Sequence, residues 1–292
     1  MFKSLKRKSP MEIALYWFVS FVFLLVALSY LYIIVWAFIA GAKTHTEVAI
    51  DPFGLPKVWN FDHYLEVFRL LEVNGNNFFD MLINSIYFSV VCVFVQQFTC
   101  INFAYCATKY TFPGSKLIYP IILIVITLPL YGTGGAMYNL LKTLGLIDSY
   151  AQVITSMGAF NTFFLYYAAY FKNLSWTYAE AAKIDGANHF QIYFRVMFPQ
   201  ATPIFGALFL TQWVTIWNSY DSALIYLPNL PTLPVGIYQF NTEMIYRARL
   251  DILFAACVLI SIPAIILFIA FNKVITTNVS VGGLKGSKEE KK

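Results

Sequence analysis

The side chains best suited to chemistry lie between 204 and 241, where amides and aromatic rings occur together. The stretch from Ile204 to Tyr220 reads as one apolar helix. Candidates for contact with a solute are four residues in its second half and one directly after it: Gln212, Trp213, Trp217, Asn218 and then Asp221. Aromatic planes beside amides suit a sugar, because ring C–H groups stack on aromatic faces while hydroxyls need hydrogen-bond partners. The alternative is an aromatic belt at a membrane interface, in which Trp217 and Tyr220 only anchor the helix.

Asp221 is a weaker candidate for an ion relay. It lies ~26 Å along the helix from Ile204 at 1.5 Å per residue, which places it near a membrane surface.

A second candidate region runs from Trp176 to Pro203. Thr177 and Glu180 have the spacing of a capping box, and Gly186 is placed to end the helix that they begin. Asn188 and Gln191 open a second short helix. Its aromatic and apolar residues recur at helical spacing: Phe190, Tyr193, Phe194 and Met197. We expect Pro199 and Pro203 to interrupt the chain before the next apolar stretch. Two short helices bent at a glycine would lie on the membrane surface, and an ordinary amphipathic linker is the alternative interpretation.

Motifs of hydrolytic and nucleotide-binding enzymes are absent. The chain has no GxxxxGK[ST], HExxH or GxSxG sequence, and Gly-Lys never occurs. The four cysteines lie in apolar runs without a CxxC pair, so we expect neither disulfides nor zinc. We therefore expect no enzyme activity, no bound metal and no cofactor in this chain.

Composition indicates a polytopic membrane protein. The chain is 59% hydrophobic and 12% charged, about half the charge of a soluble domain. Six uncharged windows exceed the ~20 residues that cross a bilayer. They are 13–42, 81–108, 117–141, 149–171, 196–220 and 252–272. A seventh window, 222–242, is excluded as a span because Pro228, Pro231 and Pro234 would break it. The sequence thus predicts an all-α membrane protein with six transmembrane helices.

The distribution of basic residues sets the orientation. With the N-terminus inside, the cytoplasmic segments hold 14 of the 20 basic residues. Both termini are then cytoplasmic, and the net charge of +5 does not indicate nucleic-acid binding. The segments follow in order: cytoplasmic 1–12, a first helix 13–42, an outside loop 43–80, a five-helix core 81–275 with an inside loop 172–203 and an outside loop 227–251, and a cytoplasmic tail 276–292. A signal peptide is the alternative for the first helix, but the apolar run is about twice the usual length.

Polar residues within the apolar windows predict contacts between the helices. Asn84, Ser85, Gln96, Gln97 and Asn102 should bond neighbouring helices, and lining a polar path is the less common outcome. Window 117–141 should be kinked or unwound near Gly132–Gly135. In loop 43–80, the stretch from Phe61 to Leu71 is amphipathic and predicts a short surface helix, with a plain linker as the alternative.

The inside loop carries a family resemblance. Its Glu180-Ala181-Ala182, Gly186 and Val196-Met197-Phe198-Pro199 form EAA-x3-G-x9-V-x-F-P. This resembles the EAA loop of ABC importer permeases, although that family ends in Ile-x-Leu-Pro. The AAKIDGA wording, TLPVGIYQF near 232–240 and the Gly-Gly-x-Lys-Gly tail resemble the maltose-permease-like sugar branch.

The resemblance implies a type I ABC importer (MetI-like) permease fold in a bacterial plasma membrane. It implies partners too: a second permease, two ATPase subunits that bind ATP and Mg, and an extracellular sugar-binding lipoprotein. The implied ATPase contacts are Glu180, Ala181, Ala182, Asp185, Gly186, Phe190 and Pro199, with Gly282, Gly283, Lys285 and Gly286 in the tail. The implied sugar contacts in loop 227–251 are Tyr238, Gln239 and Asn241.

Two other functions remain open from the residues. A permease for a non-sugar solute would share the EAA loop. A standalone channel or secondary transporter should show inverted repeats and an ionisable residue at mid-membrane, and none of the six windows contains a charge.

Overall fold

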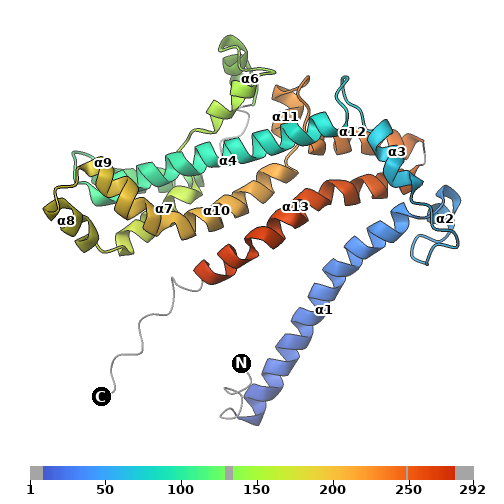
Figure 1. Cartoon of the computed structure of the whole chain (residues 1–292), viewed down its shortest axis with the longest axis horizontal. Coiled ribbons are helices and arrows are strands. Elements are labelled where there is room, and N and C mark those ends of the chain that lie inside the picture. Colours follow the sequence, from blue (N-terminus) through green and yellow to red (C-terminus); the bar gives the residue numbers. More distant parts are fainter. Residues whose placement is uncertain (1–8, 129–133, 248, 280–292) are drawn as a thin grey trace. The chain divides into compact units, whose positions relative to one another are not determined.

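The computed structural model describes residues 9–128, 134–247 and 249–279 (Figure 1). Within these ranges the chain is helical, apart from turns and one isolated bridge between Val73 and Asn76. It divides into two compact units. One comprises residues 1–71 with 239–262, and the other comprises 72–238 with 263–292. The helices α12 (Leu233–Tyr246) and α13 (Leu250–Val279) each contribute to both units.

The larger unit is built on α4 (Phe78–Lys109), which packs against α7 (Thr162–Asn173) and α10 (Phe198–Asn218) (Figure 1). The 3₁₀ helix η2 (Tyr150–Ser156) also lies on α4. The shared core includes Ile101, Tyr167, Phe171 and Met197, all fully buried. Side chains of α5 (Ser115–Thr127), α8 (Thr177–Ile184), α9 (His189–Ile192) and the π-helical turn η3 (Tyr193–Met197) also belong to this core or pack against it. The unit further contains α6 (Gly134–Thr143) and α11 (Asp221–Tyr226).

Amide side chains join the helices of this unit, as expected. Asn84 donates to the Pro231 carbonyl at 3.1 Å and accepts from the Tyr150 hydroxyl at 2.9 Å. Gln97 accepts from the buried Tyr167 hydroxyl at 2.8 Å. The expectation is wrong for Asn102, whose amide donates to Phe98 one turn earlier on α4.

The smaller unit joins the end of α1 (Pro10–Gly41) to α2 (His45–Ile50), α3 (Asp62–Leu70) and the start of α13. A Cβ on Gly41 would lie 2.8 Å from the Ala255 backbone nitrogen, so only glycine permits this close approach. The predicted amphipathic helix is confirmed as α3, which buries His63 and Val67.

A buried carboxylate organises this unit. Asp251 is fully buried and accepts hydrogen bonds from Arg249 Nε at 3.0 Å and Nη2 at 2.9 Å. His63 Nε2 lies 3.2 Å from the same carboxylate, and its Nδ1 lies 3.2 Å from the Gly41 carbonyl oxygen. The Asp251 carboxylate raises the pKa of the Arg249 guanidinium above its usual range. The ion cluster therefore ties α13 to α3 and to the end of α1.

Three described helices are long and apolar enough to cross a membrane: α1, α4 and the 250–270 part of α13. They match three of the six predicted windows. Window 196–220 contains α10, a helix of 21 residues that carries the Gln212 and Asn218 amides. The prediction of one continuous helix is wrong for window 149–171.

Window 149–171 is divided because Ser149 caps η2, and Asn161 then caps a separate helix, α7. In window 117–141, α5 ends at Thr127 and α6 begins at Gly134, so Gly134 and Gly135 of the stretch expected to unwind are helical. Residues 129–133 lie outside the described ranges.

The outside loop 227–251 is also more ordered than predicted, because it contains the 14-residue helix α12. Pro234 does not break this helix. It is the second residue of α12, where its missing N–H has no partner to lose.

Candidate functional site

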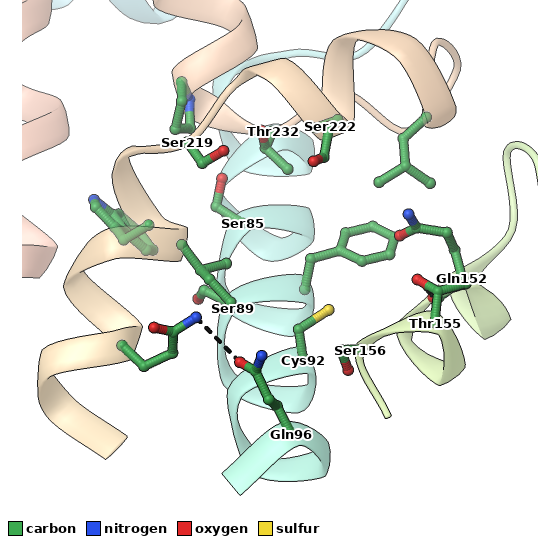
Figure 2. Close-up of a pocket in the computed structure, with 17 residues that line it drawn as sticks. Ser85, Ser89, Cys92, Gln96, Gln152, Thr155, Ser156, Ser219, Ser222 and Thr232 are labelled. Carbon is green, nitrogen blue, oxygen red and sulfur yellow. Dashed lines mark hydrogen bonds between the residues drawn. The ribbon is translucent and has the colours of Figure 1, made fainter. Parts of the chain in front are cut away.

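A polar cavity of about 240 Å³ lies within the larger unit, between α4, η2, α10 and α11 (Figure 2). One face of α4 lines it, with Ser85, Ser89, Cys92 and Gln96 at helical spacing. Polar residues from the other elements complete the wall: Gln152, Thr155, Ser156, Gln212, Ser219, Ser222 and Thr232. The remaining lining residues are apolar, including Phe88, Ile216 and Trp217. The cavity thus presents hydroxyls and amides beside aromatic surface, and none of its lining residues is charged.

Two glutamines join the helices on either side of the cavity. Gln212 Nε2 on α10 donates to Gln96 Oε1 on α4 at 3.1 Å (Figure 2). Near the other end of the cavity, the Leu233 backbone N–H donates to Ser85 Oγ at 2.7 Å, which fixes the first turn of α12 against α4.

Of the residues that the sequence singled out as candidate solute contacts on α10, Gln212 and Trp217 line the cavity. Ser85 and Gln96 line it too, which is the outcome that the sequence analysis gave as the less common one. Trp213 does not line the cavity. Its buried ring stacks on the ring of Trp217, with centroids 5.0 Å apart. The spacing of Ser85, Ser89, Cys92 and Gln96 on one helical face is the signal that sequence reading missed.

Other predicted contacts lie elsewhere. The Asn218 amide donates to the Val214 carbonyl at 2.8 Å on its own helix, and Asp221 is exposed at the start of α11. Neither residue lines the cavity. Tyr238 is exposed and stacks on Tyr220 with centroids 4.6 Å apart. Gln239 and Asn241 are exposed on the part of α12 that belongs to the smaller unit.

A second surface is formed by α8 and α9, which meet at Gly186. The predicted helix end is confirmed: Gly186 has φ +83°, its N–H bonds the Lys183 carbonyl, and the Ala187 N–H bonds the Ala182 carbonyl. This is the Schellman pattern, in which a glycine adopts the left-handed conformation. The second predicted cap is also confirmed, because Asn188 and Gln191 form a capping box.

The predicted Thr177–Glu180 capping box is wrong. Trp176 occupies the N-cap position without a side-chain bond, and Thr177 is the first helical residue. Ser175 Oγ instead accepts from the Thr177 N–H at 3.3 Å. Glu180 is therefore an exposed acidic side chain in the first turn of α8.

The predicted break at Pro199 and Pro203 is also wrong. Helical backbone runs from α9 through η3 into α10 without interruption. Pro199 occupies the first turn of α10, directly after the wider π turn, where Phe198 N–H bonds the Tyr193 carbonyl. A wider turn gives the proline ring room beside the carbonyl four residues earlier.

The side chains of α8 and α9 divide between two directions. Ala179 is buried, and Ala182 and Ala187 pack against the core of the larger unit. Ala181, Asp185 and Pro199 are exposed. The most exposed apolar side chains are Ile184 at 86% and Phe190 at 78%. Ile184 is a residue that sequence reasoning missed.

Two contacts hold this surface on the base of α4. Lys109 Nζ donates to the Leu174 carbonyl at 2.6 Å, and the Tyr110 hydroxyl lies 3.0 Å from His189 Nδ1. The predicted tail contacts Gly282, Gly283, Lys285 and Gly286 lie outside the described residues.

Comparison with known protein families identifies the chain. Residues 103–281 match the family described as the binding-protein-dependent transport system inner membrane component. The chain belongs to this family. The match includes α8, α9, α10 and α13, and the protein is a multi-pass membrane permease.

Curated relatives of this permease align over most of their length. One is the arabinooligosaccharides transport system permease protein AraQ of Bacillus subtilis, 29% identical over 90% of this chain and 94% of that protein. Another is the diacetylchitobiose uptake system permease protein NgcG of Streptomyces coelicolor, 28% identical over 85% of this chain and 82% of that protein.

A solved structure has the same fold. It is a chain of a bacterial ABC transporter involved in the import of the acidic polysaccharide alginate, with a TM-score of 0.73 and 23% identity over 91% of this permease and 98% of that chain. At this identity the likeness concerns the fold alone.

Proposed function

We propose that this permease is the membrane-spanning subunit of an ATP-driven importer of oligosaccharides. Family membership supports the importer role. Relatives support the cargo, since similar proteins are named as transport permeases for arabinooligosaccharides, diacetylchitobiose, trehalose and galactooligosaccharides. The observation in this chain that carries the sugar assignment is the uncharged cavity of hydroxyls, amides and Trp217.

The permease crosses the membrane six times, with both termini in the cytoplasm. The three continuous spans are supplemented by α10 and by the two interrupted windows, 117–141 and 149–171. Interrupted helices within a membrane are tolerated where neighbouring helices cover the free backbone groups, and they often mark transport paths.

ATP is hydrolysed by separate subunits that dock on α8 and α9. The exposed Ile184 and Phe190 form the apolar centre of this docking surface, and Glu180 and Asp185 add exposed acidic groups. The helical backbone is continuous from α9 through η3 into α10. A displacement of the docking surface is therefore transmitted along this continuous helix to Gln212. The other partners are a second permease and an extracellular sugar-binding lipoprotein.

Purification of this permease from its native membrane in mild detergent tests the assembly. We expect an ATPase, a second permease and an extracellular binding protein to co-purify. Uptake of radiolabelled trisaccharides of arabinose, galactose and glucose into proteoliposomes holding this assembly tests the cargo. Recovery of this chain alone, under conditions where a known importer stays whole, contradicts the assembly. Transport of amino acids or phosphate in place of any saccharide would favour the non-sugar alternative.

A further inference from the structure

We propose that the cavity between α4, η2, α10 and α11 is a subsite for one ring of an uncharged saccharide, supplied by this chain alone. The proposal rests on the oligosaccharide function above and specifies its substrate class. Every lining residue belongs to the larger unit, so the subsite needs no residue from a partner.

A buried hydroxyl without a partner points to a ligand. Thr232 is 6% exposed and lines the cavity (Figure 2), and its Oγ1 has no hydrogen-bond partner among the described residues. An unpaired buried polar group is destabilising. The Leu233 N–H bond to Ser85 Oγ fixes the backbone next to Thr232 and leaves the Thr232 side chain free to rotate about χ1. Because Oγ1 has less than 1 Å² of exposed surface, a ligand hydroxyl would pair with it only after this rotation turns the hydroxyl into the cavity.

The glutamine pair offers a matched donor and acceptor. Their mutual bond uses Gln212 Nε2 and Gln96 Oε1. The other two amide atoms, Gln96 Nε2 and Gln212 Oε1, have no partner among the described residues, and both side chains line the cavity. A sugar hydroxyl both donates and accepts, so neighbouring hydroxyls on one ring fit a donor beside an acceptor.

The rest of the wall and the volume suit a single ring. Trp217 and Phe88 offer aromatic surface for the C–H groups of a sugar. The cavity of about 240 Å³ is smaller than the ~300–1,000 Å³ typical of pockets for drug-sized ligands. It therefore holds one ring of an oligosaccharide, and the other rings extend beyond this chain's cavity.

The absence of charged lining residues sets the substrate class. A carboxylate that enters such a cavity without a cation loses its hydration and gains no ion pair, which costs several kcal/mol. The subsite thus excludes uronic-acid rings. We therefore expect the substrate class of this permease to differ from that of its structural neighbour, which belongs to a transporter involved in the import of the acidic polysaccharide alginate.

Cys92 provides a direct probe, because it lines the cavity and is a free cysteine. Its alkylation by N-ethylmaleimide is measured by mass spectrometry in the assembled importer. The ligands are the neutral trisaccharides of arabinose, galactose and glucose, and trigalacturonate is the acidic counterpart. Cys106, an exposed cysteine on the same helix α4 outside the cavity, is the internal control. We expect a neutral trisaccharide to protect Cys92, trigalacturonate to give no protection, and Cys106 to react equally in all samples.

Two variants remove the proposed contacts. Thr232→Val and Gln212→Leu should each raise the saccharide concentration that gives half-protection by about tenfold, which corresponds to ~1.4 kcal/mol. The matched controls are Thr215→Val and Asn218→Leu, exposed residues of α10 outside the cavity, which should leave it unchanged. Thr232→Val should also keep or raise the melting temperature, because it removes an unpaired buried hydroxyl. A role that is only structural predicts the opposite change.

The outcomes separate this proposal from the proposed function. Uptake of a neutral trisaccharide without protection of Cys92 overturns the subsite and leaves the importer function standing. Equal protection by trigalacturonate overturns the uncharged class. If the assembly transports no saccharide, the proposed function fails and the subsite fails with it.

Discussion

The side-chain amide of Gln212 on α10 donates a hydrogen bond to that of Gln96 on α4, with 3.1 Å between Nε2 and Oε1. This bond joins α10, whose backbone continues from the proposed docking surface through η3, to α4, the central helix of the larger unit. It also borders the cavity to which we assign the sugar ring.

The glutamine pair gives a double-mutant prediction. Gln96→Leu alone leaves the Gln212 amide without its partner and should lower the free energy of unfolding by ~1–2 kcal/mol. Adding Gln212→Leu should restore most of that loss, since two apolar side chains need no partner. Saccharide uptake should remain impaired in both variants. Thermal unfolding in detergent and uptake into proteoliposomes measure the two effects, and full uptake in the double variant would contradict a role in sugar contact.

Gly186 gives a prediction about backbone conformation. A Cβ there meets no atom within 4 Å, but φ is +83°, so Gly186→Ala is strained by backbone conformation alone. We expect a cost of ~1–2 kcal/mol and weaker coupling of ATP hydrolysis to uptake. Gly135→Ala is the control, because Gly135 is helical with open space around it and has no left-handed φ. Equal effects of the two substitutions would argue against a need for the Gly186 turn.

Substitutions on the proposed docking surface should prevent binding of the ATPase. Ile184→Asp and Phe190→Asp each place a charge on one of the two most exposed apolar side chains of the α8–α9 surface. Each substitution should abolish co-purification of the ATPase and leave the permease folded. Ile50→Asp is the matched control. The Ile50 side chain is 84% exposed, close to the values for Ile184 and Phe190, but it lies at the end of α2 in the smaller unit. Retention of the ATPase in both docking variants would rule out this surface.

Glu180 separates docking from helix stability. The predicted cap between Glu180 and Thr177 is not formed. Glu180→Ala should therefore change the free energy of unfolding of the permease by at most about 0.5 kcal/mol, with little change in melting temperature. A measurable fall in ATPase affinity would then report a charge contact with the partner. A large loss of permease stability in the absence of the ATPase would contradict the exposed position of Glu180.

The ion cluster of the smaller unit predicts a large stability effect. Asp251→Asn removes the carboxylate that pairs with Arg249 and His63 in a fully buried position, and should cost ~3 kcal/mol or more. Glu243→Gln removes the exposed partner of Arg247 and should cost at most ~1 kcal/mol. Thermal unfolding of both variants in detergent makes the comparison, and equal shifts would show that Asp251 is not structurally central.

Local signals in the sequence were sufficient for several features. Gly186 ends α8 and Asn188 caps α9, because caps depend on residues within one turn. The apolar runs that became α1, α4 and α13 were also evident, since a long uncharged run has few alternatives in a membrane. The family was visible in the EAA loop for a related reason: its pattern lies within one continuous stretch of chain.

Only the tertiary structure decided where other side chains go. Thr177 has a capping pattern, but the packing of Trp176 against the core of the larger unit starts α8 one residue earlier. Pro199 follows the π turn that accommodates it, and Pro203 remains inside α10 because tertiary packing outweighs its intrinsic cost. The cavity combines Gln96, Gln152, Gln212 and Thr232, which are far apart in sequence. Residue types therefore determined that amides and aromatic rings were present, and the packing of α4, η2, α10 and α11 decided which of them share one cavity.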